Sequence, residues 1–464
     1  MPISEKKSDF MGTEPIGKLL VKFATPAILS ATINCAYNVV DRLYIGRGIG
    51  PDAQAGLALT FPIMIILLAF GVLVGIGSSS VISILLGEKR QDMAEKVLGQ
   101  AFAMFCLFIV TFQALGLAFL DKILVWFGGT EQAIPYAHKY LSIILWGNIF
   151  QHISFGLGSI IRAEGNANKC MLVIFLGAGL NIILDPIFIF TFNLGIAGAA
   201  YATVLSMIAS SAWVMAHFCL GQGVLRLRLR NIRIFKGELL WRVLSVGIAP
   251  CLMQIVHSSV VIVYNHSFKH FAVDGAQATL AIGAFGIVNS VLMFMLMPAF
   301  GIMQGSQPII GYNYGAKNFL RVRRTLRTAT GISAAICFVM TLVMQICARY
   351  FALCFSKDAT LIDLSSHALR VTGCGFTFIA MGMLTTSYYQ SVGKAGLSIF
   401  LSLTRQIIIL IPAIIILPRV LGFKGIWWSG PISDLLSAMI ASIFFVHECR
   451  KLRRMASMSG ELKQ

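Results

Sequence analysis

The sequence predicts an all-α membrane protein in which about twelve transmembrane helices form two six-helix bundles related by a pseudo-twofold axis along the membrane normal. Three observations support this fold class. The composition is 57% hydrophobic and only 12% charged, and the mean hydropathy is +0.81. A pattern of glycine, proline and polar residues from the first half also recurs about 228 positions later. Soluble globular chains do not carry so many long apolar stretches.

The internal repeat rests on landmarks that return in the same order at a nearly constant offset. The pairs are Gly165 with Gly393, Gly77-Ser78 with Gly305-Ser306 and Gly87-x-Lys89 with Gly315-x-Lys317 at 228 positions, Gly195-x-x-Gly198 with Gly422-x-x-Gly425 at 227, and Pro26 with Pro250 at 224. This regularity indicates a duplicated six-helix unit. An even number of spans inserts both copies with the same orientation, which places the symmetry axis along the membrane normal.

Runs of about twenty apolar residues between charged residues or Gly and Pro breaks define the expected helices. The expected spans are 16–40, 55–84, 95–119, 136–161, 170–190 and 195–218 in the first half and 239–266, 277–311, 325–350, 364–391, 397–418 and 425–448 in the second. The predicted domains are a cytoplasmic tail at 1–15, an N-terminal lobe at 16–220, a basic cytoplasmic linker at 221–238, a C-terminal lobe at 239–448 and a basic cytoplasmic tail at 449–464.

The distribution of basic residues predicts the orientation. Of 37 Lys and Arg residues, 26 fall with the N-terminus and the even-numbered loops, 10 fall with the odd-numbered loops, and Arg405 lies inside a helix. Both termini are therefore expected in the cytoplasm, with the chain in the plasma (inner) membrane. The basic residues behind the net charge of +18 lie at the edges of the apolar spans. This placement indicates contact with anionic lipid rather than with nucleic acid. The first apolar stretch lacks a cleavage site and is expected to stay as helix one.

The ten cysteines contain no CxxC pair and fall mostly inside spans, which argues against a zinc site or a disulfide framework. Ionisable groups inside spans are more informative, because each costs about 2.5–3.5 kcal/mol on insertion scales. The clearest are Asp41, Asp185 and Asp434, and the weaker cases are His152, His257 and Arg405. The histidines are expected to be hydrogen-bonded core residues and Arg405 to pair with a carbonyl. Asp434 is a candidate cavity acid, with a place near a helix end as the alternative.

Helix one carries a polar stripe that leads to the first of these acids. Asn34, Tyr37, Asn38 and Asp41 follow the spacing of three and four that places side chains along one helical face. Pro26, earlier on the same helix, is expected to kink it.

Helix five predicts a small oxygen-rich patch. Asn181 and Asp185 lie four positions apart, Gly177 allows close approach of a neighbouring helix, and Pro186 leaves a carbonyl without its usual donor. Thr203 on helix six is expected to add a hydroxyl. Such amides and hydroxyls also commonly join transmembrane helices, so a purely structural role is the alternative for them. That alternative is weaker for two carboxylates in one half of the chain.

The duplication provides an internal control for these residues. The counterparts of Asp41, Asn181, Asp185 and Thr203 in the second half are Asn265, Ile407, Ile411 and Gly430. An acidic pair that the scaffold required would be expected in both halves. Its restriction to one half favours a functional role.

These motifs together resemble the MATE family, the multidrug and toxic compound extrusion transporters, over nearly the whole chain. The quoted segments are Tyr37-Asn-Val-Val-Asp41 followed by Ile45-Gly46, Asn181-x-x-x-Asp185-Pro186, Gly195-x-x-Gly198-Ala-Ala-x-Ala-Thr203 and Arg162-Ala-Glu-Gly-Asn166. The resemblance implies a twelve-helix antiporter for drugs or metabolite cations. Its DinF-like and MepA-like branch implies a proton or cation site in the N-terminal half, at the positions of Asp41, Asn181, Asp185 and Thr203. The NorM-like branch is disfavoured, since 240–266 and 364–391 contain no acid.

The resulting expectation is a secondary antiporter that exports organic cations or drugs in exchange for H⁺ or Na⁺, acting as a monomer in the lipid bilayer without any further cofactor or bound metal. Na⁺, if it is the coupling ion, is expected at Asp41, Asn181, Asp185 and Thr203. A lipid-linked saccharide flippase of the same superfamily is the nearest alternative, although about fourteen spans and several cleft cations would be expected of it. A channel is the alternative from another class. An enzyme is not expected, because the sequence shows no HExxH, P-loop or Ser-His-Asp pattern.

Overall fold

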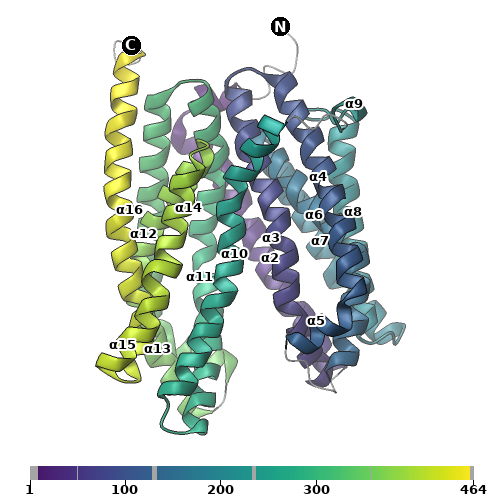
Figure 1. Cartoon of the computed structure of the whole chain (residues 1–464), viewed down its shortest axis with the longest axis vertical. Helices are drawn as coiled ribbons and strands as arrows, with labels where there is room; N and C mark the ends of the chain where they lie inside the picture. The colour runs from purple at the N-terminus through teal and green to yellow at the C-terminus, as the bar shows by residue number, and fades with distance from the viewer. Residues whose placement is uncertain (1–8, 50, 128–132, 233–236, 357, 460–464) are drawn as a thin grey trace. The chain divides into compact units, whose positions relative to one another are not determined.

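The structure is a computed structural model, and it describes residues 9–49, 51–127, 133–232, 237–356 and 358–459. Within these ranges all regular elements are helical, and twelve helices are long and apolar enough to cross a membrane (Figure 1). The predicted all-α membrane fold class is confirmed.

The elements of the first half are α1 (Phe10–Thr13), α2 (Ile16–Gly48), α3 (Pro51–Gly87), α4 (Gln91–Ala118), α5 (Leu120–Trp126), α6 (Ile134–Ala163), α7 (Ala167–Pro186), η2 (Ile187–Thr191), α8 (Ile196–Cys219) and α9 (Leu229–Ile232). Those of the second half are α10 (Gly237–Phe271), α11 (Gly275–Gly315), α12 (Phe319–Phe355), α13 (Ala359–Ser391), α14 (Ala395–Leu403), η3 (Thr404–Leu410), α15 (Ile411–Leu421) and α16 (Lys424–Met458).

Most helices extend beyond the predicted apolar spans. The first predicted span, 16–40, agrees with the candidate membrane span Ile16–Tyr37, and α2 continues beyond it to Gly48. Asp41 and the arginines after it end the apolar run, but charged residues do not break a helix. The fifth and eleventh spans each contain a π-helical segment, η2 and η3. Segment η2 begins directly after Pro186, where the missing backbone N–H interrupts the regular ladder.

The repeat glycines adopt matching backbone conformations in the two halves. Gly165 and Gly393 have φ values of +98° and +75°, and Gly195 and Gly422 have values of +58° and +63°. Only glycine adopts such angles at no steric cost, so the turns that need it keep it in both copies. The duplication seen in the sequence therefore corresponds to the same turns built twice.

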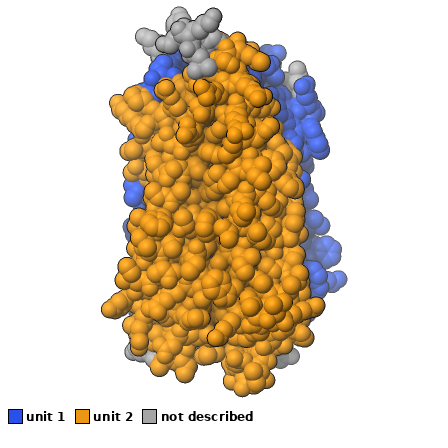
Figure 2. Space-filling model, turned by 90° about the vertical axis from the view of Figure 1, so that its left-hand side faces the viewer, with its two compact units in different colours: residues 1–14, 29–251 blue, residues 15–28, 252–464 orange. Residues whose placement is uncertain are grey.

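The chain divides into two compact units by its contacts. Unit 1 consists of Met1–Glu14 and Leu29–Cys251, and unit 2 of Pro15–Ile28 and Leu252–Gln464 (Figure 2). The unit boundaries thus lie inside α2 and α10. The predicted lobes, 16–220 and 239–448, follow chain order and stay a prediction.

In each unit, a close contact at a glycine holds the helix segment that comes from the other half of the chain. In unit 1, a Cβ added to Gly247 of α10 would lie 1.8 Å from the carbonyl oxygen of Leu73 in α3. In unit 2, a Cβ added to Gly305 of α11 would lie 2.7 Å from the backbone nitrogen of Ala24 in α2. Backbones approach this closely only where side chains are absent, as is common between membrane helices. The start of each half's first long helix is therefore packed into the other half's unit.

The outer surfaces of the helices are apolar. Large side chains such as Ile346, Ile262 and Ile443 keep 73%, 68% and 70% of their surface exposed. So many exposed apolar groups would be a liability in water but suit hydrocarbon. The chain is accordingly a multi-pass membrane protein.

The contact at Gly247 generates a stability prediction. Gly247→Ala should lower the unfolding free energy in detergent by roughly 1–3 kcal/mol, because the new methyl group overlaps the Leu73 carbonyl. Gly286→Ala is the matched control, since a Cβ there meets no atom within 4 Å. Thermal unfolding followed by size-exclusion chromatography measures both. An unchanged melting temperature for Gly247→Ala would contradict the close packing of α3 and α10.

Candidate functional site

Unit 1 brings together the predicted polar residues of α7 and α8. The Nδ2 atom of Asn181 lies 3.2 Å from Oδ1 of Asp185 and 3.2 Å from Oγ1 of Thr203. Oγ1 of Thr203 in turn donates to the carbonyl of Ala199 at 2.9 Å. Asp185 is completely buried and Asn181 is 2% exposed. Asn181 therefore bridges the carboxyl group and the hydroxyl group across the two helices.

Asp41 joins this group from α2. Its carboxyl group lies within reach of a side-chain hydrogen bond with Asp185 and interacts with it electrostatically. A hydrogen bond between two carboxyl groups requires a proton on one of them. The two acids singled out in the sequence thus share one site inside unit 1, where a single proton can be held between them.

Tyr140 of α6 completes the site, and sequence reasoning missed it. This tyrosine is 3% exposed. Its hydroxyl lies within hydrogen-bonding reach of Thr203 and interacts with Asp41, Asp185 and Tyr37. In the sequence it follows His138 and Lys139 near a helix start, where it reads as an ordinary interfacial aromatic residue. No local signal distinguished it, because only the packing of α6 against α8 directs it inward.

The local sequence explains why α7 and α8 approach so closely. A Cβ at Gly177 would lie 2.6 Å from Oγ of Ser210, and that hydroxyl donates to the carbonyl of Val173 at 3.3 Å. Near the other end, a Cβ at Gly198 would lie 2.8 Å from the carbonyl group of Phe188. The predicted close approach at Gly177 is present. Small residues on both sides of Asn181 and Thr203 set their separation.

The site retains unused oxygen acceptors. Among the described residues, Oδ1 of Asn181 and Oδ2 of Asp185 are buried and have no hydrogen-bond partner. Buried acceptors without donors are costly, so each is suited to receive a proton or a hard cation. Carboxylate, amide and hydroxyl oxygens are the donor set that alkali and alkaline-earth cations prefer. The four residues Asp41, Asn181, Asp185 and Thr203 fit either occupant.

The remaining predicted residues of helix one contribute unequally. Tyr37 lies close enough to interact with Tyr140, whereas Asn34 is exposed. The side chain of Asn38 lies outside the described residues. Pro26 lies inside α2, two positions before the end of the segment assigned to unit 2.

In unit 2, Asp434 is 5% exposed and accepts a hydrogen bond of 2.6 Å from Nε of Arg405. The expectation that Arg405 pairs with a carbonyl is therefore wrong, because a buried carboxylate offers the stronger partner. Asp434 lies inside α16, away from both of its ends, so the placement near a helix end is wrong and its role as a cavity acid stays a prediction. His152 matches its expectation, because its ring nitrogens lie 2.9 Å from the carbonyl oxygens of Asn148 and Leu67.

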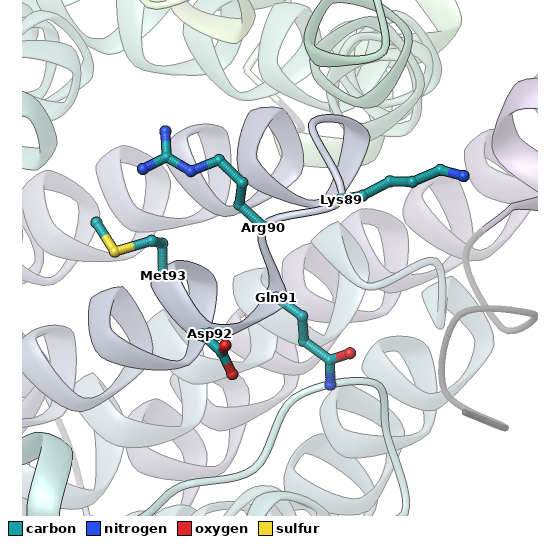
Figure 3. A pocket seen from close by; sticks show the side chains of 5 residues that line it. All are labelled: Lys89, Arg90, Gln91, Asp92 and Met93. Carbon is teal, nitrogen blue, oxygen red and sulfur yellow. The ribbon is translucent and has the colours of Figure 1, made fainter. Parts of the chain in front are cut away.

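A surface pocket lies at the turn between α3 and α4 and is formed by the consecutive residues 89–93 (Figure 3). The side chains of Lys89, Arg90 and Gln91 point in different directions. Gln91 donates to the carbonyl of Val224 at 2.6 Å. Side chains that diverge in this way form no common ligand site, so this pocket is a feature of the turn.

The comparisons with known proteins agree with this architecture. The family model MatE matches residues 26–187 and 252–416, more than half of the chain. The multidrug export protein MepA of Staphylococcus aureus (strain MRSA252) is 26% identical over 435 residues, covering 92% of this chain and 93% of the relative. The protein of the same name from Staphylococcus haemolyticus is 25% identical, covering 94% of each.

A solved structure described as MATE in the straight conformation has a TM-score of 0.90 and 25% identity, covering 97% of this chain and 99% of the other. The family model spans both halves, and its members are transporters rather than enzymes. The chain belongs to the MatE family.

Proposed function

We propose that the chain is a secondary active antiporter that exports organic cations or drugs in exchange for H⁺ or Na⁺. Relatives that cover more than nine-tenths of the chain are named multidrug export proteins, which supports a small-molecule substrate. The observation that carries the coupling proposal is the buried acidic site of unit 1, with Asp41 and Asp185 in mutual contact. Carboxyl groups are kept in a membrane interior where an ion or a proton must bind.

The proposed coupling reaction is the filling and emptying of this site. An empty site with both acids ionised would place two negative charges next to each other, which is unfavourable in a poorly solvated interior. Binding of H⁺ to Asp185, or of Na⁺ to the four oxygen-bearing side chains, removes that repulsion. A potential of 100 mV contributes about 2.3 kcal/mol for each charge moved, and a tenfold gradient adds about 1.4 kcal/mol. At one-for-one exchange, a tenfold ion gradient alone sustains a tenfold substrate gradient, and the potential adds to it where the cycle moves net charge.

Helix α2 is the proposed link between the site and the rest of the molecule. Asp41 belongs to the part of α2 in unit 1, whereas Pro15–Ile28 belongs to unit 2. Pro26 removes one backbone hydrogen bond near that boundary and makes bending easier. We therefore propose that occupation of the site changes the course of α2 and lowers the affinity for the exported cation.

The membrane orientation and assembly are part of the same proposal. The excess of Lys and Arg in the even-numbered loops supports cytoplasmic termini in a plasma (inner) membrane. The working unit is proposed to be a monomer in contact with anionic lipid. The twelve candidate spans within the described residues favour this assignment over a saccharide flippase with about fourteen.

Asp41→Asn and Asp185→Asn should each abolish ion-coupled export while leaving the protein folded, because the amide cannot take up and release a proton. Everted vesicles with a fluorescent organic cation, under a pH gradient or a Na⁺ gradient imposed separately, give the measurement. Asp121→Asn, at a carboxyl whose side chain is 80% exposed, is the matched control. Wild-type export rates in Asp41→Asn would remove this site from the mechanism.

Ion binding at the site should also stabilise the folded protein. A ligand at one hundred times its Kd adds about 2.7 kcal/mol of stability, so the melting temperature should rise with the coupling ion. Wild type and Asp185→Asn are compared in NaCl and in choline chloride at equal ionic strength, and then over a pH series. We expect Asp185→Asn to lose the rise in melting temperature that wild type shows. The coupling ion is Na⁺ if this difference appears between NaCl and choline chloride, and H⁺ if it appears over the pH series. An identical response in both proteins would contradict ion binding at Asp185.

Tyr140→Phe should reduce the export rate by roughly two- to tenfold, because the lost hydroxyl no longer supports Thr203 and a hydrogen bond is worth about 0.5–1.5 kcal/mol. The ring stays in the core, so expression and melting temperature should change little. Tyr136→Phe, one turn earlier on the same helix, is the control. Equal rates for the two variants would show that Tyr140 only fills space.

A further inference from the structure

Arg405 lies deep inside a membrane-spanning segment. It is ten residues after Ala395 in a span that ends at Leu421, which places it about 15 Å from one end and about 24 Å from the other at 1.5 Å per residue. A guanidinium group stays charged at any physiological pH. At this depth it is costly unless acceptors or water surround it.

Asp434 satisfies only part of this guanidinium group. The described contact uses Nε as donor and Oδ1 of Asp434 as acceptor, and no other hydrogen bond of Arg405 is found among the described residues. The Arg405 side chain is 31% exposed, whereas that of Asp434 is 6% exposed. The terminal nitrogens therefore offer four N–H donors without a described acceptor, on a side chain that is partly exposed.

The packing around Asp434 fixes the orientation of the pair. A Cβ at Gly375 of α13 would lie 3.0 Å from Oδ2 of Asp434 and 2.6 Å from Pro431, so α13 closes one side of the carboxylate. Segment η3 carries Arg405, and π-helical segments are frequent at functional sites. Because Asp434 holds Nε, the edge formed by the two terminal nitrogens faces away from it.

The chemistry around the pair favours an anionic partner. The charge of Asp434 is already compensated by Arg405, which leaves no spare negative charge for an organic cation. His257 lies within electrostatic reach of Arg405. Guanidinium and imidazole groups are both donors, and a carboxylate accepts from a guanidinium group in bidentate geometry.

We propose that Arg405, oriented by Asp434, is the binding site in unit 2 for the carboxylate of an organic substrate. The inference deepens the proposed function and rests on it, since it assigns a residue to the recognition of exported compounds that carry a carboxylate. Asp434 acts as a positioning residue, and Arg405 contacts the substrate.

The test compares a cationic xanthene dye as its ethyl ester with the same dye as its free carboxylic acid, bound to the purified full-length protein in nanodiscs. Arg405→Gln should weaken binding of the acid by about ten- to hundredfold, as expected for a hydrogen bond between charged groups. Binding of the ester should change less than twofold. Arg405→Lys keeps the charge but not the planar fork and should give an intermediate loss. Fluorescence anisotropy measures each Kd.

Two controls keep the result interpretable. Arg405→Gln leaves Asp434 buried without its cation, so the double variant Arg405→Gln with Asp434→Asn removes both charges. It should bind the ester normally and still lose the acid. Arg419→Gln, at an exposed arginine in the last turn of α15, controls for net charge and should bind both dyes as wild type does.

Two outcomes would overturn the proposal: unchanged binding of the acid in the double variant, or equal loss of acid and ester in it. Export of the ester by wild-type vesicles under an ion gradient is measured separately. Absence of that export would count against the antiport function and not against the carboxylate site, because the binding experiment uses no gradient.

Discussion

The burial of the Asp185 carboxyl group is the constraint on which the architecture of unit 1 depends. A carboxylate without solvent needs a proton, a cation or several donors, and the described neighbours supply only the amide of Asn181. Asp41 adds a second acid to the same site. Repulsion between the two carboxyl groups therefore favours a proton or a cation there more strongly. Thr203 and Tyr140 complete the group. The proposed occupant of this site is therefore a proton or a cation.

The two halves of the chain share a scaffold but compensate their buried charges in different ways. Equivalent glycines adopt the same positive φ in both copies, so the turns were preserved through duplication. Unit 1 holds two acids that require an external cation or proton. Unit 2 holds an acid that an internal arginine already neutralises. The two copies of the scaffold therefore differ in charge: the acidic site to which we assign ion coupling lies in unit 1, and the internally compensated pair lies in unit 2.

Close packing at glycine ties each half of the chain to the other half's unit. Gly247 places α10 against α3 in unit 1, and Gly305 places α11 against α2 in unit 2. In hydrocarbon there is no hydrophobic force between helices, so such van der Waals contacts provide much of their association. Helix α2 belongs to both units and also carries Asp41 and Pro26. Helix α2 therefore connects the acidic site in unit 1 directly with the segment that belongs to unit 2.

The sequence by itself determined the membrane class and the duplication, because hydropathy and spacing are local properties. It also singled out Asp41, Asn181, Asp185 and Thr203, which the structure brings together, because the cost of a buried charge can be judged from the sequence. The place where α2 ends could not be predicted, since helices continue past the apolar run that the sequence reveals. Only the tertiary structure brought Tyr140 to Thr203 and Arg405 to Asp434. The two residues of each pair lie on different membrane spans, and their contact depends on interhelical packing that no local pattern encodes.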